Sequence, residues 1–438
     1  MTQLEAAPSR ARVGVAAFLC GLAFILYLDR NCWSLAVKPI SNELDFDGKW
    51  QIGTISAAFS LAYALFEIPV GHWGDRHGSR GVLARIVVCW SVFTAATGAC
   101  VGFWSLLVVR FLFGAGEAGA FPNVARVLAG WFPLTERGRV QGFVLASSLA
   151  GGAASPVLAA YLIDAWGWRW MFAIFGVVGF VWVGAFLAWF RDDPAAHPAV
   201  NAAELEVIRD NRTAFEAHHE PLPWRQALSH PAIWLLILLM NCAAFVTYFF
   251  YTWYPTYLQE ARQVDPRPAG WLTGLVLAMS AVGMFAGGFA ADSIRRRSRN
   301  PVRPRRVYCA AVYLCAAVLL LASKWTDHAV GSAVLAAASC LAFFLQQSFW
   351  WLCAIEVSGK HVGALMGLMN GMGVFGSMGS QLFFGLFADW MKRLGYTGRA
   401  QFDPAFYVYA AALVVGAVAW LVVDTSRPIG RTESAAAT

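Results

Sequence analysis

The sequence predicts an all-helical integral membrane protein, with twelve membrane-spanning helices in two pseudo-symmetric six-helix bundles. Three observations support this fold class: the composition, the spacing of long apolar runs, and a polar motif that occurs twice. The 438 residues are 58% hydrophobic and only 13% charged, and they include 20 Trp and 32 Phe. This composition is typical of a polytopic membrane protein and excludes a soluble domain built around one core.

Apolar runs long enough to cross a bilayer follow one another along the chain. Six precede residue 190 and six follow residue 230, with a polar segment between them. We therefore expect an N-terminal bundle over 1–190, a cytoplasmic linker over 191–230, and a C-terminal bundle with a short tail over 231–438. The runs lie near 13–37, 51–71, 82–101, 103–125, 140–163, 168–190, 231–258, 268–291, 307–323, 329–355, 361–388 and 404–423.

The linker contains the pattern of one short helix. Asn201 can cap its N-terminus with Glu204 at the third position. Leu205, Ile208 and Phe215 can then form a single apolar edge. This predicts an amphipathic helix along the cytoplasmic face of the bundles.

The distribution of Lys and Arg predicts the orientation of the chain. Segments on the same side as the N-terminus carry 21 of these residues, and the opposite loops carry 9. Both termini are therefore expected in the cytoplasm of a cell (inner) membrane protein. The net charge of +7 follows from this asymmetry, so no nucleic-acid partner is expected.

Cysteine and histidine give no pattern of a metal or redox site. The nine cysteines are odd in number and form no CxxC pair, and the eight histidines are scattered. We expect neither a metal nor an organic cofactor. The segment before the first apolar run, Met1–Arg12, is short and polar, so no cleavable signal is expected.

The fourth apolar run carries two opposite charges at membrane depth, Arg110 and Glu117. A charged side chain there costs at least ~2.5–3.5 kcal/mol on insertion scales. Seven residues are two helical turns, so the two charges share a face about 10 Å apart. Gly114 and Ala118 continue that face with small side chains, which lets another helix approach. A structural ion pair that locks two helices is one interpretation; the floor of a binding site is the one we favour.

A loop motif occurs after the second span and again after the eighth. GHWGDRHGSR covers Gly71–Arg80, and GFAADSIRRR covers Gly288–Arg297. An Asp can cap a neighbouring helix while arginines bind helix C-terminal carbonyls. Positive-inside anchoring alone is the simpler explanation, but the duplication favours a cytoplasmic gate. The predicted gate residues are Gly71, Asp75, Arg76, Arg80, Asp292 and Arg296.

The six-plus-six plan, the Gly71–Arg80 loop, the Trp168–Phe172 run WRWMF and the loop Pro133…Glu136-Arg137 resemble the major facilitator superfamily. Within it, Tyr27–Asn31, the Arg110–Pro122 run and WYPTYL at Trp253–Leu258 are similar to the anion:cation symporter family. The resemblance implies the major facilitator fold. It also implies an organic anion as substrate, taken up with protons in the bacterial members.

The resemblance further implies roles for two arginines and two acids in the first and fourth spans. Arg30 and Arg110 would hold the substrate carboxylate, because a guanidinium stays charged and offers two parallel donors. Asp29 and Glu117 would carry the coupling protons, because burial favours a neutral carboxyl and a nearby arginine favours an ionised one.

Aromatic and amide side chains are candidates for the rest of the cavity. We expect substrate contacts from Tyr27 and Tyr63 in the first half, and from Gln347, Trp350 and Asn370 in the second. For the amides the alternative is an interhelical hydrogen bond worth ~0.6–2 kcal/mol. For Trp350 it is a lipid-facing or core aromatic.

We therefore expect a monomeric secondary transporter, not an enzyme, that imports a small organic anion by proton symport with alternating access. The expected substrate is a sugar acid: a hexonate, hexuronate or aldarate. Exchange of organic anions, or uptake of an aromatic carboxylate, remains the alternative within transporters. A membrane enzyme would need a nucleophile–base pair or a metal cluster at a span end, and a channel would not need two duplicated gates.

Overall fold

The computed structural model describes residues 7–209, 224–298, 302–358, 362–425 and 429, with the side chains of 68, 71–77, 134 and 362–364 left out. Throughout these ranges the regular structure is helical. Packing divides the chain into two units. Unit 1 comprises residues 1–36 and 58–219, and unit 2 comprises residues 37–57 and 220–438. The boundaries after Ala36 and Ala57 fall inside two helices, Trp33–Glu43 and Lys49–His77, so each of them has residues in both units.

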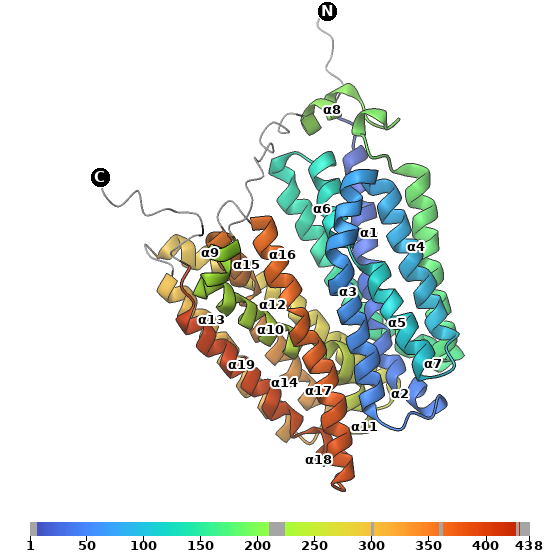
Figure 1. The fold of residues 1–438 in the computed structure, drawn as a ribbon, viewed down its shortest axis with the longest axis vertical. Helices are drawn as coiled ribbons and strands as arrows, with labels where there is room; N and C mark the ends of the chain where they lie inside the picture. Colours follow the sequence, from blue (N-terminus) through green and yellow to red (C-terminus); the bar gives the residue numbers. More distant parts are fainter. Residues whose placement is uncertain (1–6, 210–223, 299–301, 359–361, 426–428, 430–438) are drawn as a thin grey trace, which may run out of the picture. The chain divides into compact units, whose positions relative to one another are not determined.

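Unit 1 is built on helices whose bounds follow the first six apolar runs (Figure 1). The long helix α7 contains two spans, because Gly167 adopts φ 81° and ψ 165° within it and bends the chain. α7 packs along both α1 and α4, and α4 packs along α5. The helices are α1 (Ala11–Asn31), α2 (Trp33–Glu43), α3 (Lys49–His77), α4 (Ser79–Gly98), α5 (Phe103–Glu117), α6 (Ala120–Trp131), α7 (Leu134–Trp189) and α8 (Ala202–Arg209).

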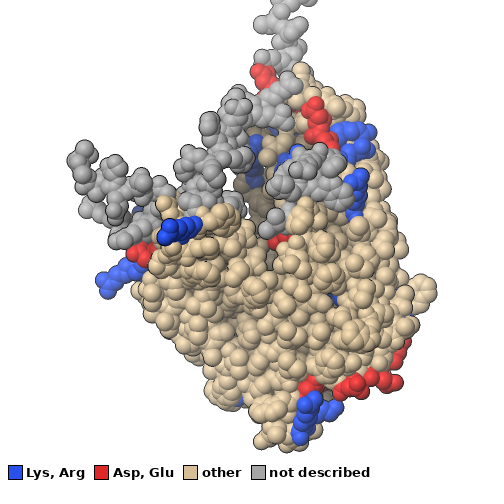
Figure 2. Space-filling model, in the orientation of Figure 1, with Lys and Arg blue, Asp and Glu red and all other residues tan. Residues whose placement is uncertain are grey.

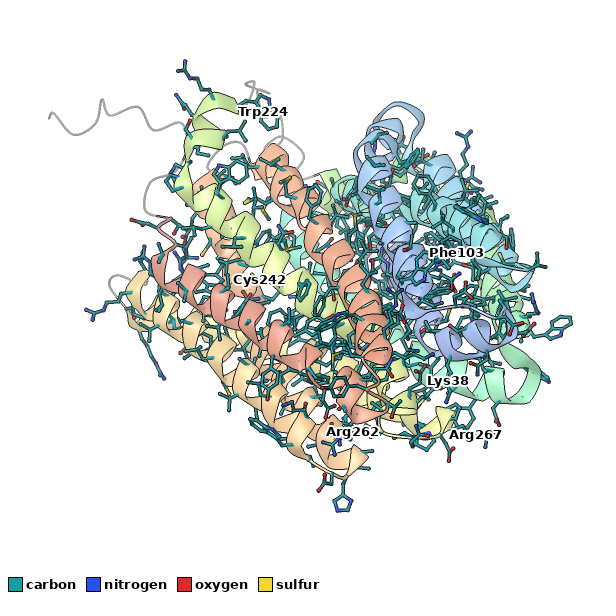
Figure 3. All side chains as sticks on the ribbon, turned by 60° about the horizontal axis from the view of Figure 1, so that its bottom comes forward. Lys38, Phe103, Trp224, Cys242, Arg262 and Arg267 are labelled. Atoms are coloured by element: carbon teal, nitrogen blue, oxygen red, sulfur yellow. The ribbon has the colours of Figure 1, made fainter. Side chains whose placement is uncertain are left out.

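Unit 2 repeats the plan with the last six apolar runs. Trp224 and Arg262 lie at opposite ends of this unit with Cys242 between them, so the chain from α10 through α11 crosses it completely (Figure 3). The main packing pairs are α12 with α14, α13 with α14 and α19, and α10 with α17. The elements are α9 (Trp224–Ser229), α10 (Pro231–Tyr248), η3 (Phe249–Trp253), α11 (Tyr254–Glu260), α12 (Pro266–Arg297), α13 (Val302–Trp325), α14 (Ala329–Phe344), α15 (Gln347–Ser358), α16 (Val362–Met372), α17 (Val374–Arg393), α18 (Arg399–Phe402) and α19 (Ala405–Val422).

The surface agrees with a membrane setting. Among the described residues, nine helical stretches are long and apolar enough to cross a membrane, and one of them, Thr135–Trp189, holds two of the predicted spans. On the face drawn in Figure 2, most of the surface between the ends carries no charged side chain, whereas Lys, Arg, Asp and Glu gather at the ends. Large apolar side chains such as Val181 and Phe289 are exposed, as lipid-facing residues are.

Five of the described spans are divided between helical elements, which the apolar runs alone do not indicate. The first is divided at Cys32, the fourth at Ala118–Gly119, the tenth between α14 and α15, and the eleventh at Gly373 between α16 and α17. The seventh passes through a π-helical turn, η3. First and seventh spans, and fourth and tenth, are equivalent in a six-plus-six repeat. In membrane transporters, discontinuous helices mark the binding region, because non-helical backbone is tolerated only where it is buried or lines a cavity.

The linker helix α8 joins unit 1 through one buried carboxylate. Asn201 Oδ1 accepts the Glu204 N–H at 2.9 Å, which confirms the predicted cap. Glu204 in turn accepts the backbone N–H groups of Ala11 and Arg12, each at 3.1 Å, and so caps the N-terminus of α1. Ile208 is buried, as expected for the apolar edge, and Phe215 lies outside the described residues.

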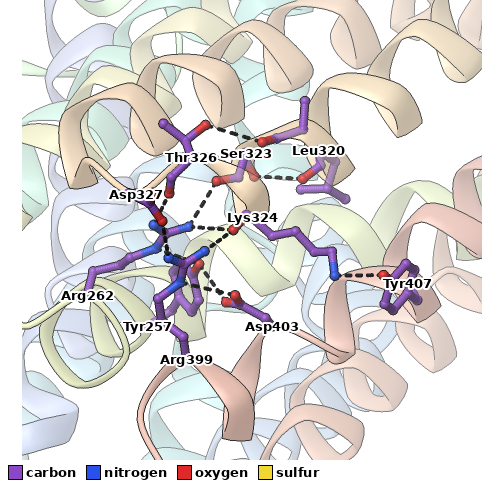
Figure 4. Close-up of polar contacts among 11 residues, drawn as sticks. Tyr257, Arg262, Leu320, Ser323, Lys324, Thr326, Asp327, Arg399, Asp403 and Tyr407 are labelled. Atoms are coloured by element: carbon purple, nitrogen blue, oxygen red, sulfur yellow. Dashed lines mark hydrogen bonds and ion pairs between the residues drawn. The ribbon is translucent and has the colours of Figure 1, made fainter.

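One end of unit 2 is closed by a group of polar side chains around the C-terminus of α13, which we call the α13 cap (Figure 4). Arg262 donates to the carbonyls of Ser323 and Lys324 at 3.0 and 3.2 Å. Arg399 binds the Lys324 carbonyl, and its guanidinium lies 3.0 Å from the carboxylate of Asp327. Two arginines thus satisfy carbonyls that a helix end leaves without partners. Lys324 joins the same group, because its Nζ donates to the Tyr407 hydroxyl at 2.8 Å.

Candidate functional site

The two charged spans of unit 1 meet in an ion pair. Arg30 Nε donates to Glu117 Oε1 at 2.8 Å, and Nη2 lies 2.6 Å from the same oxygen. Glu117 is 1% exposed, and its other oxygen, Oε2, has no hydrogen-bond partner within the described part of the chain. The last residue of α5 therefore holds the last turn of α1 through one carboxylate oxygen and leaves the other available.

Arg110 has a different environment, composed of aromatic rings. Its guanidinium lies 4.5 Å from the ring centre of Phe113, 4.9 Å from that of Trp33 and 5.3 Å from that of Phe59. It is 2% exposed and forms no ion pair with any residue that the structure describes, and its Nε has no hydrogen-bond partner there. Cation–π contacts stabilise the charge but leave the N–H donors unused. Arg110 is thus a buried cation with unsatisfied donors.

Arg30, like Arg110, lies against several aromatic rings. Its guanidinium is 4.8 Å from the ring centre of Tyr63 and 5.1 Å from that of Tyr27. It is also 5.4 Å from Phe59, the ring that Arg110 contacts. Tyr27, Arg30, Tyr63 and Arg110, all predicted site residues, are therefore brought together in unit 1.

Asp29 is the second buried acid of this group. It is 1% exposed, and neither carboxylate oxygen has a hydrogen-bond partner among the described residues. Glu117 and Arg110 act on it through their charges, and the side chain of Trp90 lies close enough to act on it as a donor, although no hydrogen bond forms by distance and angle. A carboxylate with so few donors in a buried site is costly when ionised and tolerable when protonated, which is the behaviour that proton carriage requires.

Close helix packing holds these side chains in place. A Cβ added to Gly114 would lie 2.4 Å from the backbone oxygen of Phe59, so α5 and α3 touch at that glycine. A Cβ on Gly151 would lie 2.1 Å from the oxygen of Phe24, which brings α7 equally close to α1. The predicted small-residue face of the fourth span is confirmed at Gly114. It stops earlier than expected, because Ala118 has left the helix at ψ 148°.

The interruption beside Arg30 is satisfied by side chains. Ser155 Oγ donates to the Leu28 carbonyl at 2.5 Å, Cys32 Sγ to Asp29 at 3.1 Å, and Ser34 Oγ to Asn31 at 2.9 Å. At the other break, Asn123 Nδ2 donates to the Gly119 carbonyl at 2.8 Å. The Leu28 and Gly119 carbonyls also accept the backbone N–H groups of Cys32 and Asn123, at 3.2 and 3.3 Å, so these side chains add to backbone hydrogen bonds at both breaks.

The three site residues predicted in the second half belong to unit 2. Trp350 is buried, and its Nε1 donates to the Leu236 carbonyl at 3.0 Å, so it packs α15 against α10 as a core aromatic does. Gln347 Oε1 accepts from Gln346 at 3.3 Å at the break before α15. Asn370 is half-buried, and its side chain forms no hydrogen bond to another described residue. Their substrate contacts remain predictions.

The predicted gate is only partly described. The backbone of Gly71, Asp75 and Arg76 forms the last turns of α3, but their side chains lie outside the described residues. Arg80 joins two helices of unit 1: its N–H donates to Asp192 at 2.8 Å, and its guanidinium binds the Leu187 carbonyl near the end of α7. In unit 2, Asp292 and Arg296 are exposed in α12 and form no ion pair with described side chains.

Sequence reasoning missed three contributors to the site. Phe59 lies one turn before Tyr63, so helical periodicity could have placed it on the same face. Trp33 follows the break at Cys32, which no sequence pattern announced. Glu67 is a third acid inside a span of unit 1, one turn after Tyr63, and it interacts electrostatically with Arg30.

In this helical membrane protein, interrupted spans bring two arginines and two buried acids together, which is the chemistry of a site for an anion. The model of the Major Facilitator Superfamily matches residues 19–381. The chain belongs to this superfamily and, within it, to the anion:cation symporter family.

Relatives transport small anions, as their names state. A probable sulfoacetate transporter of Cupriavidus necator is 32% identical over 95% of this chain and 94% of its own length. A probable L-galactonate transporter of Escherichia coli is 30% identical over 80% of this chain and 77% of that one. The hexuronate transporter of Bacillus subtilis is 27% identical over 83% of this chain and 84% of that one.

Solved structures show the same fold. A bacterial homologue of the human lysosomal transporter Spinster, in an inward-facing and unoccupied conformation, superposes with a TM-score of 0.72 at 20% identity, over 94% of this chain and 95% of that one. A D-xylose–proton symporter gives the same TM-score at 14% identity, over 95% and 98%. The protein is thus a multi-pass membrane transporter of the major facilitator fold, and the three relatives above are named as transporters of organic anions.

Proposed function

We propose that this protein imports a small sugar acid together with protons, by alternating access. The observation that carries the proposal is the unequal state of the two buried arginines. Arg110 has unused donors, and Arg30 is held by Glu117. In such a site Arg110 can bind an anion directly, whereas Arg30 can bind one only after its ion pair with Glu117 breaks.

The ion pair gives a physical route to coupling. Ionised Glu117 competes with a substrate carboxylate for Arg30, because both are anionic acceptors for the same donors. Protonation of Glu117 removes its charge and weakens its hold on Arg30. The substrate can then bind both guanidiniums, so that loading of the proton favours loading of the anion. Asp29, the unpartnered acid beside Arg30, is the second candidate proton carrier.

The substrate class rests on the relatives. The names of the relatives include galactonate, hexuronate and galactarate/D-glucarate transporters, and all of these substrates are polyhydroxylated acids. Another relative is named a probable sulfoacetate transporter, and sulfoacetate carries a sulfonate as well as a carboxylate. Two arginines suit either class, because guanidinium binds carboxylate and other planar or tetrahedral oxyanions through paired donors. The orientation, with both termini in the cytoplasm of the inner membrane, and the monomeric state are part of the proposal.

Uptake into reconstituted vesicles tests this function. We expect a hexonate, hexuronate or aldarate to accumulate above its outside concentration when the outside is made acidic, and a neutral sugar of the same size not to. Sulfoacetate serves as the competing anion class, and an aromatic carboxylate as the third arm. Accumulation that ignores the pH gradient, with exchange of labelled for unlabelled anion intact, would identify an anion exchanger instead.

A further inference from the structure

Glu67 is an acid in a spanning helix that neither the family nor any relative's name explains. It lies in α3, one turn after Tyr63 and one turn before Gly71. Its neighbours Leu65 and Phe66 are 57% and 40% exposed, whereas Glu67 is half-buried. A carboxylate at this depth is costly unless it has a partner or a function.

The face of α3 that carries Glu67 points to Arg30. Residues four apart share one helix face, and Tyr63 lies 4.8 Å from the Arg30 guanidinium. Arg30 is the charged group that acts on Glu67. Glu67 and Glu117 both act on Tyr63, as do Arg30 and Tyr27 from α1. No ion pair joins Glu67 to a described residue, so its relation to Arg30 is electrostatic and does not include a direct contact of 4 Å or less.

The charge balance of the buried group changes once Glu67 is included. Asp29 and Glu117 alone would neutralise Arg30 and Arg110. With Glu67 the group has three acids and two arginines, so the fully ionised group is net negative and opposes an anion. Each negative charge that the substrate brings must then be offset by a proton, because unpaired charge in the membrane interior is expensive.

We propose that Glu67 is an additional proton-coupling acid, which raises by one the number of protons carried with each substrate anion. The proposal rests on the function proposed above. Substrate that binds Arg30 neutralises the charge that keeps Glu67 ionised, and a proton joins Glu67 when the anion arrives. Glu67 lies one turn closer than Tyr63 to the C-terminal end of α3. It is therefore also placed to release that proton toward the side of the membrane at which the C-terminus of α3 lies.

The test is the slope of accumulation against the pH gradient. In vesicles with the membrane potential held at zero, each coupled proton multiplies the equilibrium accumulation ratio by about ten per pH unit. We expect Glu67→Gln to lower the slope of log accumulation against ΔpH by one, which is about a tenfold loss at one pH unit. Glu67→Asp keeps an acid and should keep the wild-type slope. Glu206→Gln, at an exposed glutamate of α8, is the matched control and should change nothing.

The outcomes separate this inference from the function on which it rests. A wild-type slope of zero would overturn proton coupling as a whole. A wild-type slope above zero that Glu67→Gln leaves unchanged would overturn the role of Glu67 alone. If Glu67→Gln and Glu67→Asp both lose rate while their residual transport keeps the wild-type slope, Glu67 is structural and the proposal is wrong.

Discussion

Two arginines share the ring of Phe59 but differ in what else they contact. Arg30 has a carboxylate partner in Glu117, and Arg110 has aromatic rings on its remaining sides. The residue types at both positions could be predicted from the sequence, since charged groups at membrane depth stand out in apolar runs. The pairing could not: Arg110 and Glu117 share a helix face, yet Glu117 binds Arg30. The partner of a buried acid depends on which second helix packs against it. The sequence of a single helix does not show which helix that is.

Replacing Arg110 by lysine tests whether its donors bind the anion. Lysine keeps the charge but loses the planar pair of donors and the flat stacking surface. We expect substrate affinity to fall tenfold or more, about 1.4 kcal/mol, with expression intact. Binding to purified protein measures it, and Arg139→Lys at an exposed position of α7 is the matched control. Unchanged affinity would remove Arg110 from the site.

His197 makes a pH-dependent contact outside the spans. It is buried between Trp131 and Trp189, with its Nε2 3.1 Å from the Trp189 carbonyl and its Nδ1 accepting the Ala199 N–H. Burial lowers the pKa of His197 below its ordinary value of 6.5. The unfolded chain therefore binds the proton more readily, so the stabilisation is present above pH 6.5 and is lost as the pH falls below it.

Hydrogen exchange should report this loss. We expect amides around 189–199 to exchange faster at pH 5 than at pH 7, after correction for intrinsic rates. His197→Gln should remove most of the difference, and His328→Gln, at an exposed histidine of unit 2, should not. Equal protection at both pH values in the wild type would contradict the role of His197.

At the scale of the helix, α3 is one of two elements, with α2, that have residues in both units. Its first turn is bound to α17 of unit 2: Asp389 accepts the N–H groups of Lys49 at 2.9 Å and Trp50 at 2.8 Å. Lys49 Nζ also lies 2.6 Å from Glu260. A Cβ on Gly53 would lie 2.6 Å from the Gln381 oxygen, so the backbones touch. A carboxylate that caps a helix N-terminus in this way resembles the function we predicted for Asp75 at the other end of α3.

Asp389→Asn tests whether this cap has to open during transport. The amide loses the charge and accepts fewer hydrogen bonds, which weakens the contact by roughly 1–2 kcal/mol. We expect a cysteine at position 55, where Ile55 is fully buried, to react with a membrane-impermeant thiol reagent about five to thirty times faster. Asp327→Asn, in the α13 cap, is the matched control. Equal labelling in Asp389→Asn and wild type would show that the cap does not govern access.

The helix interruptions set the limit of prediction from sequence at this scale. The existence and order of the spans could be predicted, because their apolar length is fixed by the bilayer. The breaks at Cys32 and Ala118–Gly119 could not, since neither carries a proline; Ser155 and Asn123 add side-chain hydrogen bonds to carbonyls beside them. They are also the positions that orient Arg30 and Glu117.

For the whole molecule, superfamily membership follows from the sequence and is confirmed by the fold and the relatives. The coupling ion and the substrate do not follow from the fold, because one scaffold serves many transport reactions. In the function proposed here, coupling depends on whether a buried acid exchanges a proton as the anion binds. The account therefore rests on Glu117, the acid that must release Arg30.

Glu117→Gln is the most direct test of that claim. Glutamine keeps the shape of the side chain but cannot bind or release the proton. Reconstituted vesicles allow pH-driven uptake and exchange of labelled for unlabelled substrate to be compared in the same preparation. We predict that exchange survives, because the arginines can still bind the anion, while accumulation against a gradient is lost. Accumulation at the wild-type level would contradict the account and leave Glu117 as a structural partner of Arg30.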